Sequence, residues 1–264
     1  MMRSLYTAAS GAQAQQFHID IIANNVANVN TTGFKRVRAE FQDLLSQTFE
    51  AAGALTAQGT NVPLGVQVGL GVGVSATQRI WLPGSVQQTG NPLDMAIQGE
   101  GFFQVLLPNG QTAYTRDGSF KRDANGQLVT SDGYQMQPGI TIPNDANQIV
   151  INPDGNVFVR QSGSQTLNQV GQLQLAMFSN PAGLESVGRN LFVESPGAGA
   201  PTQGVPGQGQ FGSTTLNQGF LENANVQIVE ELIGLITAQR AFEANSQVMK
   251  ASGEVLQQVN NIAS

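Results

Sequence analysis

The 264-residue chain contains no cysteine and a single histidine, His18. The lack of thiols excludes a disulfide framework, a cysteine nucleophile and a cysteine-based metal site. One histidine cannot form a multi-histidine metal site within the chain, and Asp20 is the only carboxylate beside it in sequence. A catalytic or pH-sensing role would need such a partner, so we expect His18 to be a packed or interface residue. We expect neither a cofactor nor a metal ion.

Charge is also scarce in this sequence. Charged residues make up 11% of the chain, the formal net charge is −6 and the isoelectric point is near 4.7. An acidic balance with few, scattered cations disfavours nucleic acid as a partner, because nucleic-acid binding relies on basic patches. A surface built from amide and hydroxyl side chains suits a subunit covered by many neighbours better than a freely soluble enzyme.

Long apolar runs are missing as well. No window approaches the roughly 18 consecutive apolar residues of a membrane-spanning helix, so we expect no membrane insertion. The amino terminus lacks the apolar core of a secretory signal, because Thr7, Ser10, Gly11 and Gln13 interrupt it. If the protein leaves the cytoplasm, we expect it to do so without a cleaved signal peptide.

Both ends of the chain carry apolar residues at heptad spacing, which predicts two amphipathic helices. Neither helix is expected to be stable alone, since helices in water depend on packing an apolar face. Each therefore needs the other helix and further copies of the chain as partners. The first seam is Leu5, Ala8, Ala12, Ile19, Ile22, Val26 and Val29; the second is Ile228, Leu232, Leu235, Phe242, Met249 and Leu256, widened by Val248, Val255, Val259 and Ile262.

The helix boundaries have their own signals. The first helix is expected to end in an Asn/Thr/Gly run, with Gly33 as a left-handed cap. Asn225 is expected to cap the second helix. Glu230 and Glu231 would then lie in its first turn, where the helix dipole stabilises negative charge. Past the first helix, the apolar spacing from Phe41 to Phe49 permits one or two further helical turns.

The middle of the chain has a different period. Val66, Val68, Leu70, Val72 and Val74 alternate with mostly glycine, which predicts a strand. Short β-rich runs then alternate with turn signals, including Pro-Asn-Gly and repeated Asp-Gly or Asn-Gly pairs at about 8–12 residue spacing. The fold class is therefore predicted as α+β and mainly β, with the terminal helices pairing as a coiled-coil-like stem and a central irregular β-sandwich or barrel.

The predicted domains follow from these patterns. Residues 1–33 and 222–264 form the terminal helical assembly domain, residues 34–66 and 215–221 are extended connectors, and residues 67–214 form the β-rich outer domain. Within the first connector, residues 51–63 show only weak periodicity, and their order is expected to depend on neighbours.

Three local patterns carry a chemical alternative. Residues 207–212 match the G-x-G-x-x-G nucleotide pattern but lie in a low-complexity loop without the required strand and helix. Residues 123–126 start like a calcium loop, but the glycine comes too early and the closing acid is missing, so a hairpin turn is expected. Lys35, Arg36 and Arg38 are expected to form ion pairs between subunits or a solvated face, with an anionic-ligand patch as the alternative.

Four segments together resemble one protein family. Residues 23–36, Ala-Asn-Asn-Val-Ala-Asn-Val-Asn-Thr-Thr-Gly-Phe-Lys-Arg, are similar to the "ANNxANxNTxGFKR" signature of bacterial flagellar axial proteins, the rod and hook subunits. The tail from Asn225 to Ser246, with Gln-Arg-Ala-Phe-Glu at 239–243, resembles the closing motif of the same family, and residues 99–103 and 114–120 agree with its internal motifs. The length and the 41–63 connector are most similar to distal rod subunits. Proximal rod or hook-type subunits are the alternative.

The resemblance implies a structural subunit that polymerises helically into a hollow, torque-transmitting shaft, with helices lining an inner tube and the β domain outside. Its implied location is the flagellar basal body, in the rod that crosses the periplasm, after passage through the flagellar type III export apparatus. The implied partners are copies of itself, other rod and hook proteins at the ends, the surrounding bushing rings and the export apparatus. The implied assembly interface comprises Leu5, Ala12, Ile19, Ile22, Asn24, Asn25, Val26, Asn28, Asn30, Thr31, Gly33, Phe34, Lys35, Arg36, Ile228, Glu230, Glu231, Leu232, Leu235, Gln239, Arg240, Phe242, Asn245, Met249 and Leu256.

An enzyme is the competing hypothesis, in particular a wall polysaccharide hydrolase. It would require two carboxylates that converge in a cleft. The candidates are Asp94, Glu100, Asp117 and Asp132, each in or beside a predicted turn. Acidic residues are expected in turns on structural grounds, so we predict a protein that is not an enzyme.

Overall fold

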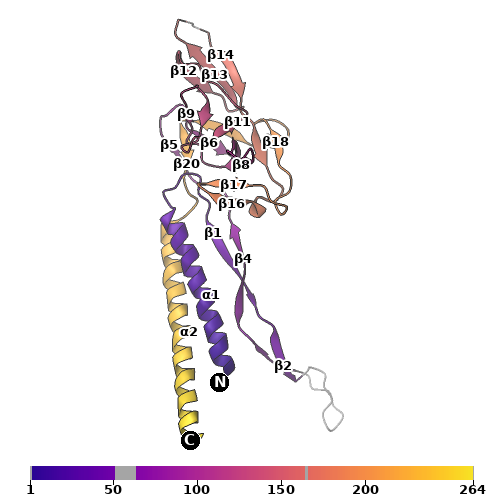
Figure 1. Ribbon diagram of the computed structural model, residues 1–264, viewed down its shortest axis with the longest axis vertical. Helices are drawn as coiled ribbons and strands as arrows, with labels where there is room; N and C mark the ends of the chain where they lie inside the picture. The colour runs from indigo at the N-terminus through magenta and orange to yellow at the C-terminus, as the bar shows by residue number, and fades with distance from the viewer. Residues whose placement is uncertain (1, 51–63, 164–165, 264) are drawn as a thin grey trace. The chain divides into compact units, whose positions relative to one another are not determined.

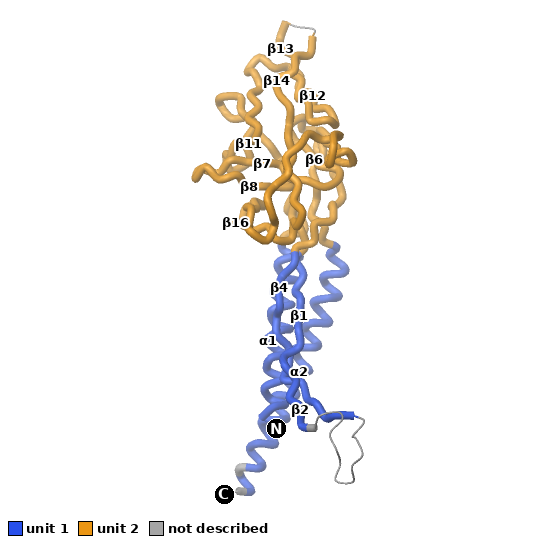
Figure 2. Tube along the Cα trace, turned by 90° about the vertical axis from the view of Figure 1, so that its right-hand side faces the viewer, with its two compact units in different colours: residues 1–27, 37–78, 227–264 blue, residues 28–36, 79–226 orange. Residues whose placement is uncertain are grey.

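The computed structural model describes residues 2–50, 64–163 and 166–263. The chain forms two compact units, coloured separately in Figure 2: unit 1 consists of residues 1–27, 37–78 and 227–264, and unit 2 of residues 28–36 and 79–226. This division differs from the one predicted. Residues 28–33 and 222–226 group with the β-rich unit rather than with the helices, and residues 67–78 group with the helices.

Unit 1 is built on two helices, α1 (Met2–Ala27) and α2 (Ile228–Ala263), which run side by side in Figures 1 and 2. Their contacts set an antiparallel register: the Ser4 and Ser252 hydroxyls lie 3.3 Å apart, and Asn25 donates to Glu231 at 3.2 Å. Between these ends, a Cβ on Gly11 would lie 3.0 Å from the side chain of Asn245. The expected pairing of terminal helices is confirmed. Neither described helix is long and apolar enough to cross a membrane.

The buried face of α1 is made mostly of alanine and isoleucine: Ala8, Ala12, Ala14, Ile21 and Ile22. The predicted seam of α2 is divided. Leu235, Phe242, Met249 and Leu256, each seven residues apart, are partly buried, whereas Ile228 and Leu232 are exposed. One helix partner therefore covers only part of the apolar surface of α2.

A β arm completes unit 1. Its strands are β1 (Val37–Asp43), which pairs with β4 (Val72–Arg79), and β2 (Ser46–Glu50), which pairs antiparallel with β3 (Val66–Gly69). The arm contacts α1, where His18 packs edge-on against Phe41 at 5.8 Å between ring centroids. The possible helical extension from Phe41 to Phe49 is wrong, because pairing with β4 and β3 satisfies this backbone as strands. The strand predicted at 66–74 is confirmed as β3 and β4, and residues 51–63 lie outside the described residues.

Unit 2 is mainly β, as predicted. Its largest sheet is antiparallel throughout, in the order β16-β17-β8-β7-β11-β10-β9. These strands are β7 (Phe103–Leu106), β8 (Thr112–Thr115), β9 (Lys121–Arg122), β10 (Leu128–Val129), β11 (Gln135–Gln137), β16 (Glu185–Gly188) and β17 (Leu191–Val193).

Smaller antiparallel groups surround this sheet: β12-β13-β14, β15-β18, β19-β6 and β20-β5. They are β5 (Val86–Gln88), β6 (Met95–Gln98), β12 (Ala146–Ile151), β13 (Asn156–Gln161), β14 (Asn168–Gln172), β15 (Leu175–Met177), β18 (Thr202–Gly204), β19 (Thr215–Gln218) and β20 (Phe220–Glu222). The low-complexity loop predicted around residues 207–212 follows β18 and contains a short 3-10 turn, Gly209–Phe211.

The core of unit 2 consists of apolar side chains from many of these strands and from the segments between them, among them Met95, Phe103, Phe120, Leu128, Val157, Leu175 and Leu216. Strand β19, near the end of the β-rich region, pairs with β6, near its beginning. The chain therefore returns to its starting edge, and residues 28–36 and 222–226 meet there.

Candidate functional site

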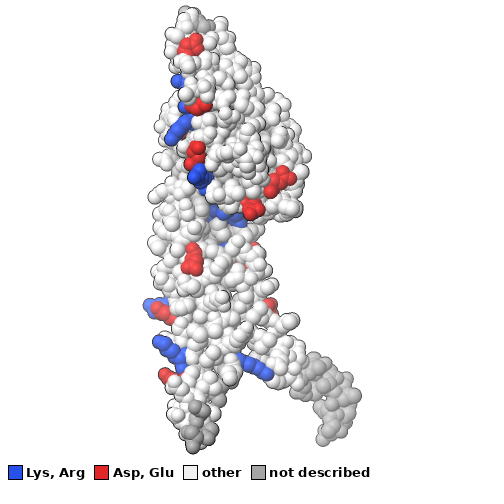
Figure 3. Space-filling view, viewed as in Figure 1, with Lys and Arg blue, Asp and Glu red and all other residues white. Residues whose placement is uncertain are grey.

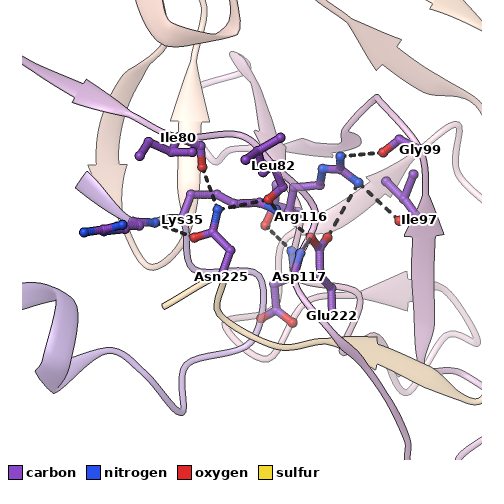
Figure 4. Close-up of polar contacts among 12 residues, drawn as sticks. Lys35, Ile80, Leu82, Ile97, Gly99, Arg116, Asp117, Glu222 and Asn225 are labelled. Carbon is purple, nitrogen blue, oxygen red and sulfur yellow. Dashed lines mark hydrogen bonds and ion pairs between the residues drawn. The ribbon is translucent and has the colours of Figure 1, made fainter. Parts of the chain in front are cut away.

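Residues 28–36, the part of the signature that belongs to unit 2 and that we call the signature segment, contain a buried lysine. Lys35 has a fully buried side chain, and its Nζ donates hydrogen bonds to Glu222 Oε1 at 2.5 Å and to the carbonyl oxygen of Leu82 at 2.8 Å. Glu222, whose side chain is 1% exposed, also accepts the backbone N–H of Gly84 at 2.9 Å. The expectation that Lys35 is solvated or paired between subunits is wrong: its partner is in the same chain (Figure 4).

A second buried cation completes the cluster. Nη1 of Arg116 lies 3.6 Å from Glu222 Oε2 and donates to the carbonyl of Ile97 at 3.3 Å, while Nη2 donates to the carbonyl of Gly99 at 2.6 Å. Burial lowers the pKa of Arg116 and of Lys35, and the nearby Glu222 carboxylate opposes that shift in both. One carboxylate thus balances two buried cations. We call Lys35, Arg116 and Glu222 the charge cluster.

Gly33 brings the signature segment close enough to reach the charge cluster. Its N–H donates to the carbonyl of Glu222 at 2.8 Å, and its φ of +67° is a left-handed conformation. A Cβ there would lie 2.6 Å from the backbone nitrogen of Asp117. The left-handed conformation was predicted, but Gly33 does not cap the helix, which ends at Ala27.

The side chain of Asn225 also binds the signature segment, through the backbone of Arg36. Its Oδ1 accepts the N–H of Arg36 at 2.7 Å, and its Nδ2 donates to the carbonyls of Ile80 and Leu82 at 2.8 and 3.0 Å (Figure 4). The prediction that Asn225 caps the second helix is therefore wrong, since α2 begins at Ile228. Its amide instead joins the N-terminal and C-terminal segments of unit 2.

Within unit 1, the signature contributes Asn25. This buried amide bonds to both backbone groups of Val37 and donates to Glu231 Oε2. Glu231, which lies in the first turn of α2 as predicted, is also buried. Arg38 is exposed and pairs with Glu40 at 3.1 Å, a contact that contributes little in water.

The solvent face of α2 carries an apolar stripe, which we define as Val229, Leu232, Ile233 and Ile236. These residues follow i, i+3, i+4 and i+7 spacing and lie on one face of the helix. Val229 is 70% exposed and Ile233 58%. Figure 3 shows that charged side chains are sparse on the visible face. The stripe is apolar surface that the single chain leaves uncovered.

The structure distributes the predicted interface residues over three environments. Buried are Ala12, Ile22, Asn25, Gly33, Lys35 and Glu231. Partly buried are Leu5, Ile19, Val26, Asn28, Thr31, Phe34, Arg36, Leu235, Phe242, Asn245, Met249 and Leu256; exposed are Asn24, Asn30, Ile228, Glu230, Leu232, Gln239 and Arg240. Sequence reasoning missed the roles of Arg116 and Glu222. Arg116 directly follows strand β8 and Glu222 ends strand β20, and the signal that the sequence offered was only the scarcity of charged residues in the chain.

Two of the four carboxylates of the enzyme hypothesis, Asp94 and Asp117, accept hydrogen bonds from nearby groups of unit 2. Asp94 accepts the hydroxyl of Thr89 at 2.6 Å, and Asp117 accepts the hydroxyl of Thr32 at 3.0 Å and the N–H of Ser119. A cavity of about 470 Å³ in unit 2 is lined by aromatic residues, Arg116 and Glu100. Glu100 is the only carboxylate of that lining, whereas glycoside hydrolysis uses a pair.

The two sequence patterns for ligands also form turns. Asp123 Oδ1 accepts the N–H groups of Asn125 and Gln127, as expected for a hairpin turn. The glycines at 207–212 lie in a loop with a 3-10 turn and are followed by strand β19, not by an α-helix. No group of three or more potential metal ligands occurs among the described residues.

Comparison with known proteins agrees with this architecture. Three family models match: "Flagella basal body rod protein" at residues 5–35, "Flagellar hook protein FlgE/F/G D1 domain" at 96–159, and "Flagellar basal body rod FlgEFG protein C-terminal" at 217–262. The "Flagellar basal-body rod protein FlgG" of Borreliella burgdorferi is 49% identical over 99% of both chains, and that of Caulobacter vibrioides 50% identical over 100% of both. The "Flagellar hook protein FlgE" of Helicobacter mustelae is 48% identical over 52% of this chain and 30% of its own length. The chain belongs to the family of bacterial flagellar basal-body rod proteins.

Proposed function

We propose that the protein is the structural subunit of the distal flagellar rod, which polymerises helically through its terminal helices into a hollow, torque-transmitting shaft. Full-length identity of about half to proteins named FlgG supports the distal rod. The hook relative is matched over only 30% of its own length, which makes the hook-type alternative weaker. The proposed location is the basal body, where the rod crosses the periplasm.

The observation that carries this proposal is the apolar stripe of α2. Fully burying an exposed leucine or isoleucine side chain is worth about 1.5–3 kcal/mol, and Leu232, Ile233 and Ile236 are 46%, 58% and 57% exposed, so covering each of them is worth about half of that. Helix α1 covers the opposite side of α2 instead. Copies of the same chain can cover the stripe in a heterologous contact, which leaves a free site at each end and permits continued growth. A polymer would therefore bury the apolar stripe that the single chain leaves exposed to water.

The structure narrows the proposed interface. Asn25, Lys35 and Glu231 are engaged within the chain, so their role in assembly is to shape the subunit. We propose that direct contacts between subunits are made by exposed members of the predicted set, such as Leu232 and Gln239, together with the rest of the stripe. The proposed further partners are other rod and hook proteins at the ends, the surrounding bushing rings and the flagellar export apparatus.

The test is to place a charge in the stripe. Leu232→Asp would bury an unpaired carboxylate in each subunit contact, and we expect it to abolish polymerisation, measured by sedimentation and electron microscopy. Gln247→Asp, at an exposed position of α2 outside the stripe, is the matched control and should polymerise. Fluorescence of Trp81, the only tryptophan, reports whether unit 2 is folded. Normal filaments from folded Leu232→Asp would refute the proposal.

We also propose that the protein is not an enzyme, in keeping with a structural family. The single carboxylate in the lining of the aromatic cavity supports this. A wall-digestion assay with the full chain tests it, and hydrolysis that disappears in Glu100→Gln would overturn it.

A further inference from the structure

The charge cluster joins two ends of the chain that are far apart in sequence. Lys35 belongs to the N-terminal segment of unit 2, residues 28–36, whereas Glu222 belongs to its C-terminal segment, residues 222–226. Arg116 belongs to neither and enters from the loop after β8. The three side chains are at most 3% exposed, so water screens their interactions poorly.

The charges in this cluster do not have equal roles. Without Glu222, Lys35 would approach a buried Arg116 of the same sign with no carboxylate between them, an arrangement that is strongly destabilising. Glu100, which also acts on Arg116, is exposed and is not a hydrogen-bond partner of either cation among the contacts of the cluster. Without Lys35, by contrast, Arg116 and Glu222 remain a one-to-one ion pair. Lys35 needs Glu222 in order to be buried, whereas Glu222 can be buried without Lys35 because Arg116 remains as its partner.

The backbone contacts follow the same dependence. Gly33 donates to the carbonyl of Glu222, and Arg36 donates to the side chain of Asn225, so the N-terminal segment docks in part on the C-terminal one. Other hydrogen bonds of this segment, from Thr32 to Asp117, from Asn190 to Thr32 and from Ile80 to the Arg36 carbonyl, are made with the rest of unit 2. The C-terminal segment has its own attachment, because β20 pairs with β5 and Asn223 donates to the carbonyl of Ser85 at 2.9 Å.

We propose that Glu222 is a positioning residue that imposes an order on the closing of unit 2: residues 222–226 dock first, and residues 28–36 can dock only afterwards. The signature segment therefore stays undocked until the chain is present to about residue 226. This order gives every subunit a free N-terminal segment until its C-terminal segment is in place. It does not depend on polymerisation, so it can fail or hold independently of the rod function.

Amide hydrogen exchange on the full chain tests this order, with the amides of Gly33 and Ile80 as probes of the N-terminal segment and that of Asn223 as probe of the C-terminal one. Ile80 reports because its N–H donates to the carbonyl of Arg36 at 2.9 Å. In Glu222→Gln we expect the Gly33 and Ile80 amides to exchange on the order of a hundredfold faster, while the amides of the β7–β8 ladder stay protected. In Lys35→Met we expect Asn223 to keep its protection.

Two further variants separate electrostatics from packing. The double variant Lys35→Met/Glu222→Gln removes the cation that Glu222→Gln leaves without a partner, and it should restore most of the protection at Gly33 and Ile80. Glu243→Gln removes one partner of the exposed Arg240–Glu243 pair and should change none of these amides.

Three results would overturn the proposal. A loss of protection at Asn223 in Lys35→Met as large as the loss at Gly33 in Glu222→Gln would show that the two segments depend on each other equally, with no order between them. Uniform loss across unit 2 in Glu222→Gln would show a global stability effect. Unchanged exchange at Gly33 in Glu222→Gln would show that the charge cluster does not hold the segment.

Discussion

The side-chain amide of Asn25 pairs with the backbone of Val37 as a neighbouring strand would. Nδ2 donates to the Val37 carbonyl at 2.9 Å, and Oδ1 accepts the Val37 N–H at 3.0 Å. The two residues lie on either side of residues 28–36, and both belong to unit 1. Asn25 therefore holds the start of β1 against the end of α1, and its second donor bond to Glu231 adds the start of α2.

Asn25→Asp tests this contact. A carboxylate cannot donate to the Val37 carbonyl, and it would lie beside the buried Glu231 carboxylate, so we expect a loss of about 1–3 kcal/mol in local stability. The measurement is exchange of the Val37 amide, which should become faster. Asn30→Asp makes the same chemical change at an exposed position and should leave Val37 unchanged. Equal protection of Val37 in both variants would contradict the role of Asn25.

Gly33→Ala tests the close approach in the signature. An L-residue at a positive φ costs about 1 kcal/mol, and here the added Cβ would also lie 2.6 Å from the nitrogen of Asp117. Gly110→Ala is the control, because Gly110 also has a positive φ, +82°, but nothing lies within 4 Å of an added Cβ. We expect the urea midpoint of Trp81 fluorescence to fall clearly further for Gly33→Ala. Equal urea midpoints for the two variants would show that the close approach of Gly33 to Asp117 does not affect the stability of unit 2.

The buried Lys35 predicts a pH dependence of stability. Burial places its folded-state pKa below the ordinary value, so in the interval between the two the unfolded chain binds more protons than the folded one. The free energy of unfolding should therefore rise with pH through that interval, because the cost of the buried cation is complete below the folded-state pKa and is lost progressively until the pH passes the unfolded-state pKa.

The matched measurement compares the wild type with Lys35→Met by denaturant titration from about pH 8 to about pH 11, around the ordinary lysine pKa. Other groups titrate in both proteins, so the difference in their free energies of unfolding isolates Lys35. This difference should shift in favour of the wild type as the pH rises. A constant difference, or a shift in the opposite direction, would contradict the direction of the Lys35 pKa.

Local sequence signals predicted the helices, strands and hairpins that are determined by residues close together in the chain. The heptad seams located both terminal helices because a helix places residues 3 and 4 apart on one face. The alternation from Val66 to Val74 located β3 and β4, and the Asn109-Gly110 pair located the β7–β8 hairpin. The stretch from Phe41 to Phe49 was misread because its apolar spacing fits a few helical turns, and only the partner strands decide otherwise.

The sequence by itself determined the two helical ends, the mainly β middle and the family resemblance, since each is encoded in residues close together in the chain. Only the tertiary structure decided that Lys35 is buried, that Asn225 joins two segments rather than capping a helix, and that residues 28–36 belong to unit 2. The physical reason is that a charge becomes a core residue only when a partner from elsewhere compensates its desolvation. For Lys35 that partner is Glu222, which periodicity and turn signals cannot pair with a residue so far away in the sequence.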